Sequence, residues 1–376
     1  MSDVVATLAR LVAEPTVSHR PLLELAAFMA QRAEDAGFRV ELFEDEQDAG
    51  KVNVVASAGP QDGQGLILSG HMDVVPVEGQ TWSSDPFCLS ERDGRLYGRG
   101  SSDMKAFLAA AVEGLDRLDL DELKRELVLV WTHDEEIGCV GSRKLVERLA
   151  DSGRPLPSEC WIGEPTDFRM LRMHPGHVAL RIRTSGRSAH SSKPDLGRSA
   201  IKGMRAVLEV VEQVELEQMQ QRRHEGFLER PYTTMNAAQI HGGVAVNMVP
   251  DRCELIVGYR PLPGDDPLEV FRILEERVKN LDASAELIRV TPSMLTPEGS
   301  PLQGLLSAHA CSHQTSAASF ATDGGNLEKL GISSMIFGPG SIDVAHAPDE
   351  YVERAALERA VHIVEAVVRD RCLGES

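Results

Sequence analysis

Apolar positions in the first 175 residues follow two alternating periods. Short apolar runs at residues 52–57, 66–68 and 127–132 predict buried strands. Residues 103–118 and 142–149 place apolar side chains at the spacing of amphipathic helices. Because strands that alternate with helices favour parallel pairing, this part of the chain predicts an α/β layer, a mostly parallel sheet with helices on both faces.

The pattern changes between residues 177 and 290. A strand, a long amphipathic helix, two strands, a second helix and a last strand follow one another there, an order that resembles a ferredoxin-like α+β domain. The first pattern returns near the C-terminus, where a helix is predicted at 354–371. We therefore expect one α/β domain made of residues 1–176 and 291–376, interrupted by an inserted domain at 177–290.

The composition narrows the classes of partner. The 376 residues carry a formal net charge of −19, and because an acidic surface repels nucleic acid and anionic membranes, we expect neither as a partner. No apolar run approaches the roughly 20 residues of a membrane helix, and we expect no secretory signal at the N-terminus. The six cysteines are scattered without a Cys-x-x-Cys pair, which favours reduced thiols in a cytoplasmic protein.

Residues 70–76 contain the first candidate chemistry. His71 and Asp73 follow the apolar run 66–68 and, two positions apart in extended backbone, share one face. A histidine with a neighbouring carboxylate is the usual pairing of a metal ligand and the group that orients it. A surface histidine beside a turn aspartate explains the same pattern. Only further ligands elsewhere in the chain decide between these two interpretations.

Four later segments supply such side chains after apolar runs. Asp103 lies among small residues at the start of a predicted helix, where the alternative role is an N-cap. Glu135 and Glu136 follow the third apolar run, where the alternative is a solvated helix start. Glu164 follows a short predicted strand, and His346 follows a Gly-Pro-Gly turn. Polar groups just beyond buried strands are where sites form on α/β sheets.

Together these segments supply two imidazoles and three carboxylates, namely His71, His346, Asp103, Glu136 and Glu164. Nitrogen and oxygen donors suit zinc, with cobalt or manganese as substitutes. Three carboxylates and one bridging hydroxide carry about four negative charges, which two divalent ions balance and one ion does not. A shared carboxylate at a metal separation of about 3.5–4 Å accommodates such a pair. Glu135 is left over for proton transfer.

The same segments resemble the motifs of the M20 family of metallo-deacylases and peptidases. The motifs run in the family's order through nearly the whole chain, and their co-occurrence is far more specific than any one of them. They lie at 71–76 (HMDVVP), 98–105 (GRGSSDMK), 134–138 (DEEIG), 163–166 (GEPT), 186–192 (GRSAHSS), 242–247 (GGVAVN), 260–264 (RPLPG) and 338–351 (GPGSIDVAHAPDEY). Residues 321–325 (ATDGG) depart from the family, whose deacetylases more often have Thr-Glu-Ala-Gly there.

The resemblance implies a ligand set around two metal ions. In the family's pattern, the residue that matches Asp103 bridges the two ions. The residues that match His71 and Glu164 complete one metal site, and those that match Glu136 and His346 complete the other. We therefore expect two divalent cations, zinc with cobalt or manganese as alternatives.

The resemblance also implies roles outside the ligand set. The residue matching Glu135 is the general base, and the residue matching Asp73 orients its histidine ligand. His190 matches a histidine on a lid domain that helps to polarise the scissile carbonyl, sometimes from the partner subunit. Arg260 matches an arginine associated with a substrate carboxylate, and Asn247 lies in a neighbouring lid motif.

For fold and activity, the resemblance implies a zinc-exopeptidase-like catalytic domain and an inserted lid and dimerisation domain. We therefore expect a cytoplasmic homodimer that hydrolyses the amide bond of an N-acyl amino acid, with N2-acetyl-L-ornithine as the expected substrate in arginine biosynthesis. N-succinyl-diaminopimelate, other acylated amino acids and peptides stay open as substrates. A non-catalytic binding protein is disfavoured because every ligand and the base are present, and a nucleotide-dependent oxidoreductase because its Gly-rich fingerprint is missing.

Overall fold

The computed structural model describes residues 4–374, and the chain divides into two compact units. Unit 1 contains the chain up to Met173, Leu295–Ala318 and the chain from Thr322 on, whereas unit 2 contains His174–Met294 and Ser319–Ala321. The short excursion at Ser319–Ala321 is absent from the sequence-based division. Residues 1–3 and 375–376, at the ends of the expected catalytic domain, lie outside the described residues.

Within residues 4–374, unit 1 is built on a nine-stranded mixed sheet. The strand order is β1 (Arg39–Asp45), β2 (Asp48–Ala58), β6 (Glu126–Thr132), β3 (Gly65–His71), β7 (Glu159–Ile162), β15 (Ser333–Ile336), β8 (Leu171–His174) and β13 (Met294–Leu295), with β14 (Ser316–Ala317) beside β8. The central strands β6, β3, β7 and β15 are parallel neighbours. β1 and β2 form an antiparallel hairpin that joins β6, so the sheet is antiparallel at this edge.

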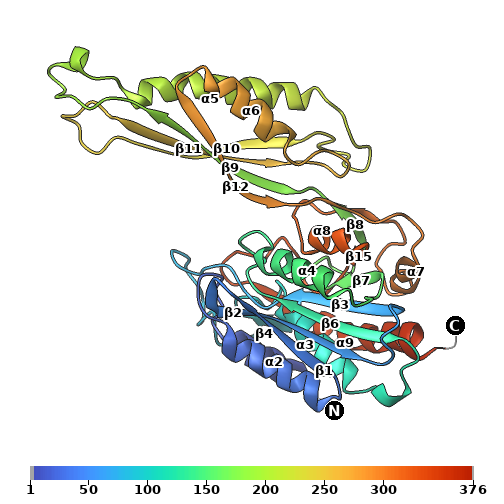
Figure 1. Cartoon of the computed structure of the whole chain (residues 1–376). Helices are drawn as coiled ribbons and strands as arrows, with labels where there is room; N and C mark the ends of the chain where they lie inside the picture. The colour runs from blue at the N-terminus through green and yellow to red at the C-terminus, as the bar shows by residue number, and fades with distance from the viewer. Residues whose placement is uncertain (1–3, 375–376) are drawn as a thin grey trace. The chain divides into compact units, whose positions relative to one another are not determined.

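Helices lie on both faces of this sheet (Figure 1). They are α1 (Val4–Val12), α2 (Leu23–Asp35), α3 (Lys105–Leu115), α4 (Val140–Ser152), α7 (Pro301–Ser307), α8 (Gly324–Leu327) and α9 (Arg354–Val368), with short helical turns at Leu120–Glu122, Glu328–Leu330 and Arg369–Leu373. α3 packs against α1 and α9, whereas α4 packs against α8. A small separate sheet joins β16 (Tyr351–Glu353), β5 (Arg95–Tyr97) and β4 (Ser90–Arg92). This arrangement is the α/β layer that the sequence predicts.

The buried helix α3 shows how the core supports the polar edge of the sheet. Its sequence, KAFLAAAVEGL, is rich in alanine, and every residue in it is buried. Gly163 permits this close packing because a Cβ at that position would lie 1.8 Å from the Phe107 ring. Lys105 Nζ donates to the carbonyls of Leu11 and Glu14 at 2.8 Å, and burial lowers the pKa of this amine to about 7. The helix that follows Asp103 is therefore held from several sides.

Unit 2 is an α+β sandwich in the predicted β-α-β-β-α-β order. Its antiparallel sheet has the order β10 (Thr234–Gly242), β11 (Arg252–Arg260), β9 (His177–Ser185) and β12 (Ala283–Thr291), and one face packs on α5 (Ala200–Met219) and α6 (Glu269–Lys279). Buried residues alternate along β9 and β11, so one side of each strand meets the helices. The edge strand β10 is exposed along most of its length.

A short 3-10 turn at Pro194–Leu196 completes the elements of unit 2. In the described part of the chain, no helix combines the length and apolar character needed to cross a membrane.

Candidate metal centre

The carboxyl ends of parallel strands bring three of the five expected ligands to one edge of the unit 1 sheet. His71 ends β3, and the strand register pairs it with Thr132 at the end of β6. Glu136 follows β6 and Glu164 follows β7, so both leave the sheet at the same edge as His71. Binding sites form at this edge in parallel sheets because the loops that leave the strands meet there.

Asp103 lies at the centre of the five expected ligands. Its Oδ1 is 3.1 Å from His71 Nε2, and its Oδ2 is 3.3 Å from His346 Nε2. Glu136 Oε2 lies 3.0 Å from His346 Nε2, and Glu164 Oε1 lies 3.9 Å from His71 Nε2. One imidazole and one glutamate therefore flank each oxygen of Asp103. Four of the five side chains are at most 7% exposed, whereas that of His346 is half exposed.

The N-cap role that was the alternative for Asp103 is absent. The N-cap of α3 is Met104, which makes no side-chain cap bond. Asp103 and Ser102 instead donate their backbone N–H groups to Glu350 Oε1, at 3.0 and 2.9 Å. Arg99 Nη1 donates to the other Glu350 oxygen at 2.5 Å, and both side chains are buried. Glu350 thus fixes the segment that carries Asp103, a role that sequence reasoning missed because it depends on a contact across 247 residues.

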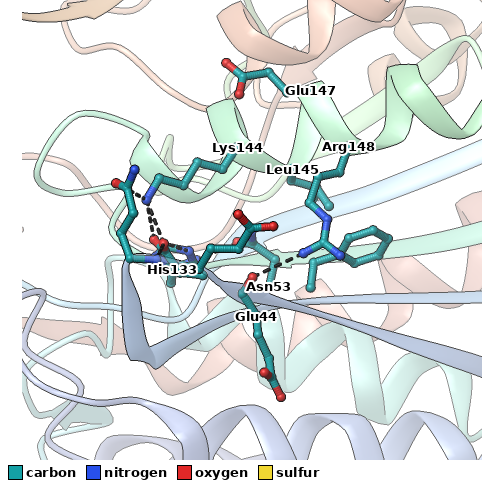
Figure 2. A pocket seen from close by; sticks show the side chains of 11 residues that line it. Glu44, Asn53, His133, Lys144, Leu145, Glu147 and Arg148 are labelled. Carbon is teal, nitrogen blue, oxygen red and sulfur yellow. Dashed lines mark hydrogen bonds and ion pairs between the residues drawn. The ribbon is translucent and has the colours of Figure 1, made fainter.

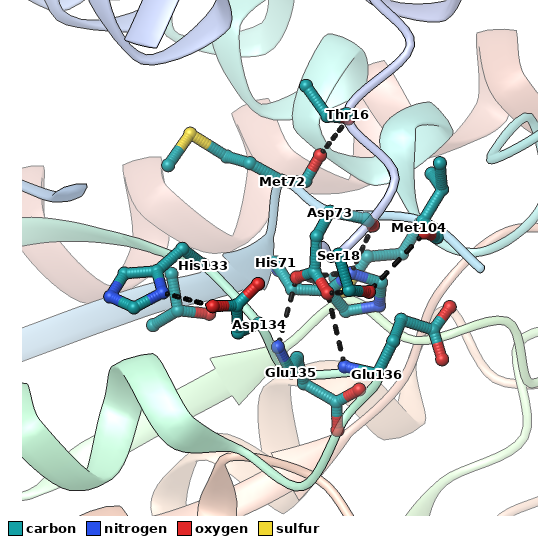
Figure 3. A network of polar contacts seen from close by, with 12 residues as sticks. Thr16, Ser18, His71, Met72, Asp73, Met104, His133, Asp134, Glu135 and Glu136 are labelled. Atoms are coloured by element: carbon teal, nitrogen blue, oxygen red, sulfur yellow. Dashed lines mark hydrogen bonds and ion pairs between the residues drawn. The ribbon is translucent and has the colours of Figure 1, made fainter. Parts of the chain in front are cut away.

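Asp73 organises the loop beyond β6 (Figure 3). Its carboxylate accepts the backbone N–H groups of Glu135 at 3.0 Å and Glu136 at 3.3 Å, and the Ser18 hydroxyl at 2.8 Å. The main-chain carbonyl of Asp73 lies 2.9 Å from His71 Nδ1, whereas its carboxylate lies 3.7 Å from the same nitrogen. The nearest Asp73 atom to the His71 ring is thus its main-chain carbonyl, and the carboxylate, which binds three other donors, lies farther from the ring.

The five expected ligands, His71, Asp103, Glu136, Glu164 and His346, form a ligand cage whose excess of carboxylates favours the binding of positive charge. Side-chain hydrogen bonds with Asp103 and Glu136 raise the pKa of His346 to about 10. Burial alone lowers the pKa of His71, but Asp103 and Glu164 outweigh it and raise that pKa well above its usual value. Burial and the Asp103 charge raise the pKa of Glu136 to about 7 and that of Glu164 well above its usual range. Protons on the imidazoles thus balance the carboxylates, and divalent cations would replace these protons.

The donor set also fits a metal ion by distance. His71, Asp103 and Glu136 each offer one ligand atom, and these atoms lie within 4.8 Å of one another. Carboxylate oxygens and imidazole nitrogens bind zinc at about 2.0–2.2 Å, so small side-chain movements suffice to enclose an ion. The residues present are therefore compatible with the metal that their chemistry predicts.

Glu135 lies beside the cage. Burial raises the pKa of its carboxyl well above the usual range. Its Oε1 accepts from Cys139 Sγ at 3.3 Å. Asp323, whose Oδ2 accepts from Thr132 Oγ1 at 2.6 Å, offers another donor atom close to these two. Neither Cys139 nor Asp323 has a role in the sequence analysis. Two features of the sequence point to them: a cysteine shortly after the paired glutamates, and the segment 321–325, which departs from the family pattern.

The three expected lid residues lie in unit 2. His190 Nδ1 is 2.7 Å from Ser192 Oγ in an exposed turn, and the Asn247 carbonyl accepts a backbone N–H at 3.0 Å. Arg260 ends β11, and burial together with the charge of Arg289 lowers the pKa of its guanidinium. Among residues 4–374, Arg260 makes no ion pair with an acidic side chain.

A hollow of about 210 Å³ in unit 1 lies beside α4 and the β1–β2 hairpin (Figure 2). It contains none of the five expected ligands. The backbone N–H of His133, one of its lining residues, donates to Asn53 Oδ1 at 3.1 Å, and His133 Nδ1 lies 3.1 Å from Asp134 Oδ2. Lys144 pairs with Asp45 at 2.6 Å on the same wall. These contacts indicate a structural role for His133.

Comparison with known proteins places the chain in a family. Residues 67–370 match the model of peptidase family M20/M25/M40. The chain is 36% identical to the acetylornithine deacetylase of Myxococcus xanthus, with 100% of each chain covered. It is 34% identical to the acetylornithine deacetylase of Vibrio atlanticus (strain LGP32), over 92% of this chain and 90% of the relative. The M20 family metallo-carboxypeptidase Sso-CP2 from Sulfolobus solfataricus shares its fold, with a TM-score of 0.81 at 19% identity over 98% and 99% of the two chains.

The chain therefore belongs to peptidase family M20/M25/M40, and it is a metallo-hydrolase of that family. The resemblance drawn from the sequence motifs, the α/β fold with an inserted sheet domain, and the expectation of an enzyme are confirmed. The two relatives at 34% and 36% identity carry the same name, acetylornithine deacetylase.

Proposed function

We propose that this enzyme hydrolyses N2-acetyl-L-ornithine to L-ornithine and acetate with two divalent metal ions. The observation that carries the proposal is the geometry of Asp103, whose two oxygens face His71 at 3.1 Å and His346 at 3.3 Å. A carboxylate between two imidazoles, with a separate glutamate on each side, suits two ions that share one bridging ligand. The names of the two relatives support the choice of substrate.

The ligands divide into two groups around Asp103. His71 and Glu164 would complete one metal site, and Glu136 and His346 would complete the other. Nitrogen and oxygen donors favour zinc, with cobalt or manganese as alternatives. When bound, such ions lower the pKa of a coordinated water toward neutrality and polarise the carbonyl of the substrate.

Glu135 is the candidate general base. Asp73 binds its backbone N–H at 3.0 Å, which fixes the position of the residue, and its side chain, whose Oε1 accepts from Cys139 Sγ, lies outside the proposed ligand set and is available for proton transfer. Burial raises its pKa, and a raised pKa suits a carboxyl that must both accept and release a proton near neutrality. Glu135 would take a proton from the attacking water and later deliver it to the leaving amine.

Unit 2 would recognise the substrate. Arg260 lies close to Arg289, which acts on it as a like charge, and no acidic side chain of the described residues pairs with it. An unpaired, partly buried guanidinium suits a carboxylate, which it can bind through two parallel hydrogen bonds. His190 would polarise the scissile carbonyl, because Ser192 engages its Nδ1 and Nε2 is left to donate. Asn247, in the neighbouring loop, would line the same surface.

We extend the proposal to a homodimer formed through unit 2. The edge strand β10 is exposed from residue 236 on, and exposed apolar side chains follow along Ile240, Val244 and Val246. An exposed strand edge pairs readily with a second copy across a two-fold axis. Analytical ultracentrifugation should show a dimer, and a concentration-independent monomer would remove dimerisation from the proposal.

The proposed setting is the cytoplasm, in arginine biosynthesis. All six cysteines are free thiols in the structure, which suits a reducing compartment. The acidic net charge of −19 again favours a small-molecule substrate over nucleic acid or an anionic membrane.

A substrate panel tests the proposal directly. The purified enzyme would be assayed with added zinc or cobalt on N2-acetyl-L-ornithine, other N-acetyl amino acids, N-succinyl-diaminopimelate and dipeptides. We expect the highest kcat/KM for N2-acetyl-L-ornithine and loss of activity with a chelator. A higher kcat/KM for N-succinyl-diaminopimelate or for a dipeptide would show that N2-acetyl-L-ornithine is the wrong substrate. It would not change the assignment of the chain to its family.

A peptidase activity is the second candidate. The shared fold with a metallo-carboxypeptidase favours it, because a guanidinium such as that of Arg260 can also hold the C-terminal carboxylate of a peptide. The dipeptide arm of the panel separates the two activities, since an acetyl group and an aminoacyl residue differ in size and in charge.

A further inference from the structure

A cluster of three donor atoms lies next to the five expected ligands and shares none of them. Glu135, Cys139 and Asp323 each offer one oxygen or sulfur, and these atoms lie within 4.8 Å of one another. All three residues are at most 9% exposed. In a tetrahedral zinc site with sulfur at about 2.3 Å and oxygen at about 2.0–2.2 Å, donor atoms stand roughly 3.5 Å apart. The 3.3 Å between Cys139 Sγ and Glu135 Oε1 already matches that spacing.

The backbone holds the first two of these donors together. The Glu135 carbonyl accepts the N–H groups of Gly138 and Cys139, both at 2.8 Å, which closes a tight turn. Cys139 has a left-handed φ of 55° and is the N-cap of α4. Asn326 Nδ2 donates to the Cys139 carbonyl at 3.2 Å, and this bond links the turn to α8. These backbone hydrogen bonds therefore fix the position of the Cys139 thiol beside Glu135.

The carboxylate of Asp323 is a second, independent observation that points to a bound cation. It precedes α8, which packs against α4, so a distant segment carries it to the turn. Its Oδ2 accepts from Thr132 Oγ1 at 2.6 Å, and the Ser142 side chain also acts on the carboxyl as a hydrogen-bond partner, but no hydrogen bond to Oδ1 itself is found among the residues that the structure describes. The residue is only 3% exposed. A buried carboxylate oxygen without a partner is costly, and neither the proposed ligand set nor the proposed proton transfer accounts for it.

We propose that Glu135, Cys139 and Asp323 form a third, inhibitory site for a thiophilic divalent cation, such as cadmium or excess zinc. Two carboxylates and a thiolate are suitable donors for such ions, and the thiolate selects them over magnesium and calcium. On binding, the S–H bond of Cys139 breaks, a sulfur–metal bond forms, and the proton leaves to solvent without any change of oxidation state. The ion would occupy the lone pairs with which Glu135 accepts a proton, so hydrolysis stops.

The site itself is independent of the proposed function, whereas the inhibition rests on the role of Glu135 as base. The experiment therefore needs one readout of binding and one of turnover. Zinc-loaded enzyme would be titrated with cadmium while the thiolate-to-cadmium ultraviolet absorbance, the bound zinc and the rate of hydrolysis are followed. The Cys88→Ser/Cys311→Ser variant is the reference protein, because it removes the two exposed thiols.

In the reference protein we expect the absorbance band to saturate at one cadmium per chain, with the bound zinc retained and the rate falling in parallel. Adding Cys139→Ser should abolish the band and raise the cadmium concentration for half-inhibition by about tenfold or more, the scale on which lost metal-site contacts act. Asp323→Asn should keep the band and weaken binding. Each rate is referred to that of the same variant without cadmium, and circular dichroism confirms that each variant is folded.

A band that persists in Cys139→Ser, or zinc that is displaced as cadmium binds, would overturn the third site. A reference protein without any band would do the same. If the band behaves as expected but no acylated amino acid or dipeptide is hydrolysed, the third site stands and the proposed function fails. If the band is lost in Cys139→Ser while half-inhibition stays unchanged, the ion binds elsewhere when it inhibits, and the inhibitory role is wrong.

Discussion

The two units handle their candidate chemistry in opposite ways. Unit 1 buries most of its expected ligands at the carboxyl ends of parallel strands, and the central Asp103 contacts both histidines while its backbone is fixed by Glu350. Unit 2 places His190 and Asn247 in exposed loops, and among the described residues the side-chain partner of His190 is Ser192. Buried groups depend on one another because an unpaired charge in the interior is costly. Exposed groups exchange partners with water at little cost.

Under the proposed function, this difference would make unit 1 the part that assembles the metal centre and unit 2 the part that recognises the substrate. Changes in the unit 1 cage should act on metal content and turnover together, because each ligand also determines the charge that its neighbours experience. Changes in unit 2 should act on substrate affinity or rate in graded steps and leave the metal content alone. The variants below test that contrast, beginning with the largest effect.

Replacing the central carboxylate is expected to have the largest effect. Asp103→Ala removes the group that faces both histidines, so both proposed metal sites lose a ligand and activity should fall to background. Metal analysis of the purified variant should find little bound zinc. Glu147→Ala, an exposed acid of the same unit, is the matched control and should retain full metal content. An Asp103→Ala enzyme that keeps two ions per chain would exclude the bridging role.

Glu135→Gln should separate chemistry from assembly inside unit 1. The amide keeps the size of the side chain but cannot accept a proton, so kcat should fall by about 10²–10⁴, the usual contribution of a general base. Because Glu135 is outside the proposed ligand set, metal content should match that of the wild type. Steady-state kinetics and metal analysis on the same preparation check both points. Retained turnover would rule out the role as base.

Much of this architecture could be predicted from the sequence because it follows from local patterns. The apolar runs that become β3 and β6 are readable, so the positions of His71 and Glu136 just beyond them could be inferred. The bonds from Glu350 to the Asp103 segment could not be inferred, since they join residues 247 positions apart. Likewise, the Asp73 carboxylate binds the backbone of Glu135 at 3.0 Å, more closely than the His71 ring at 3.7 Å, and only the folded loops determine this contact.

The antiparallel edge of the unit 1 sheet shows the same limit. The pattern of the first 175 residues favours parallel pairing, yet β2 pairs antiparallel with both β1 and β6. Local hydrophobic spacing predicts that a strand is buried, but its direction depends on the connection that precedes it. The proximity of Cys139 and Asp323 could not be predicted for a related reason, since it depends on the packing of α4 against α8 in the folded protein.

In unit 2, Arg260→Lys should affect binding more than turnover. A lysine keeps the charge but loses the planar pair of donors, so one charged hydrogen bond is lost, worth about 1.5–3 kcal/mol. KM for N2-acetyl-L-ornithine should rise by about 10- to 100-fold, with metal content unchanged. Arg183→Lys, on the exposed surface of the same sheet, is the control and should behave as wild type. An unchanged KM in Arg260→Lys would remove Arg260 from substrate binding.

The same small change made once in each unit gives the most direct comparison and the smallest effects. Ser18 donates to the Asp73 carboxylate at 2.8 Å in the buried interior, whereas Ser192 lies 2.7 Å from His190 at the surface. Ser18→Ala leaves a buried carboxylate short of one donor, so zinc affinity should fall by about tenfold. Ser192→Ala should leave zinc affinity alone and lower kcat/KM by less than about tenfold, because water replaces the lost hydroxyl. Competition with a chelator measures the first effect and steady-state kinetics the second. If Ser192→Ala weakened zinc binding as much as Ser18→Ala does, the division between an assembling unit and a recognising unit would be wrong.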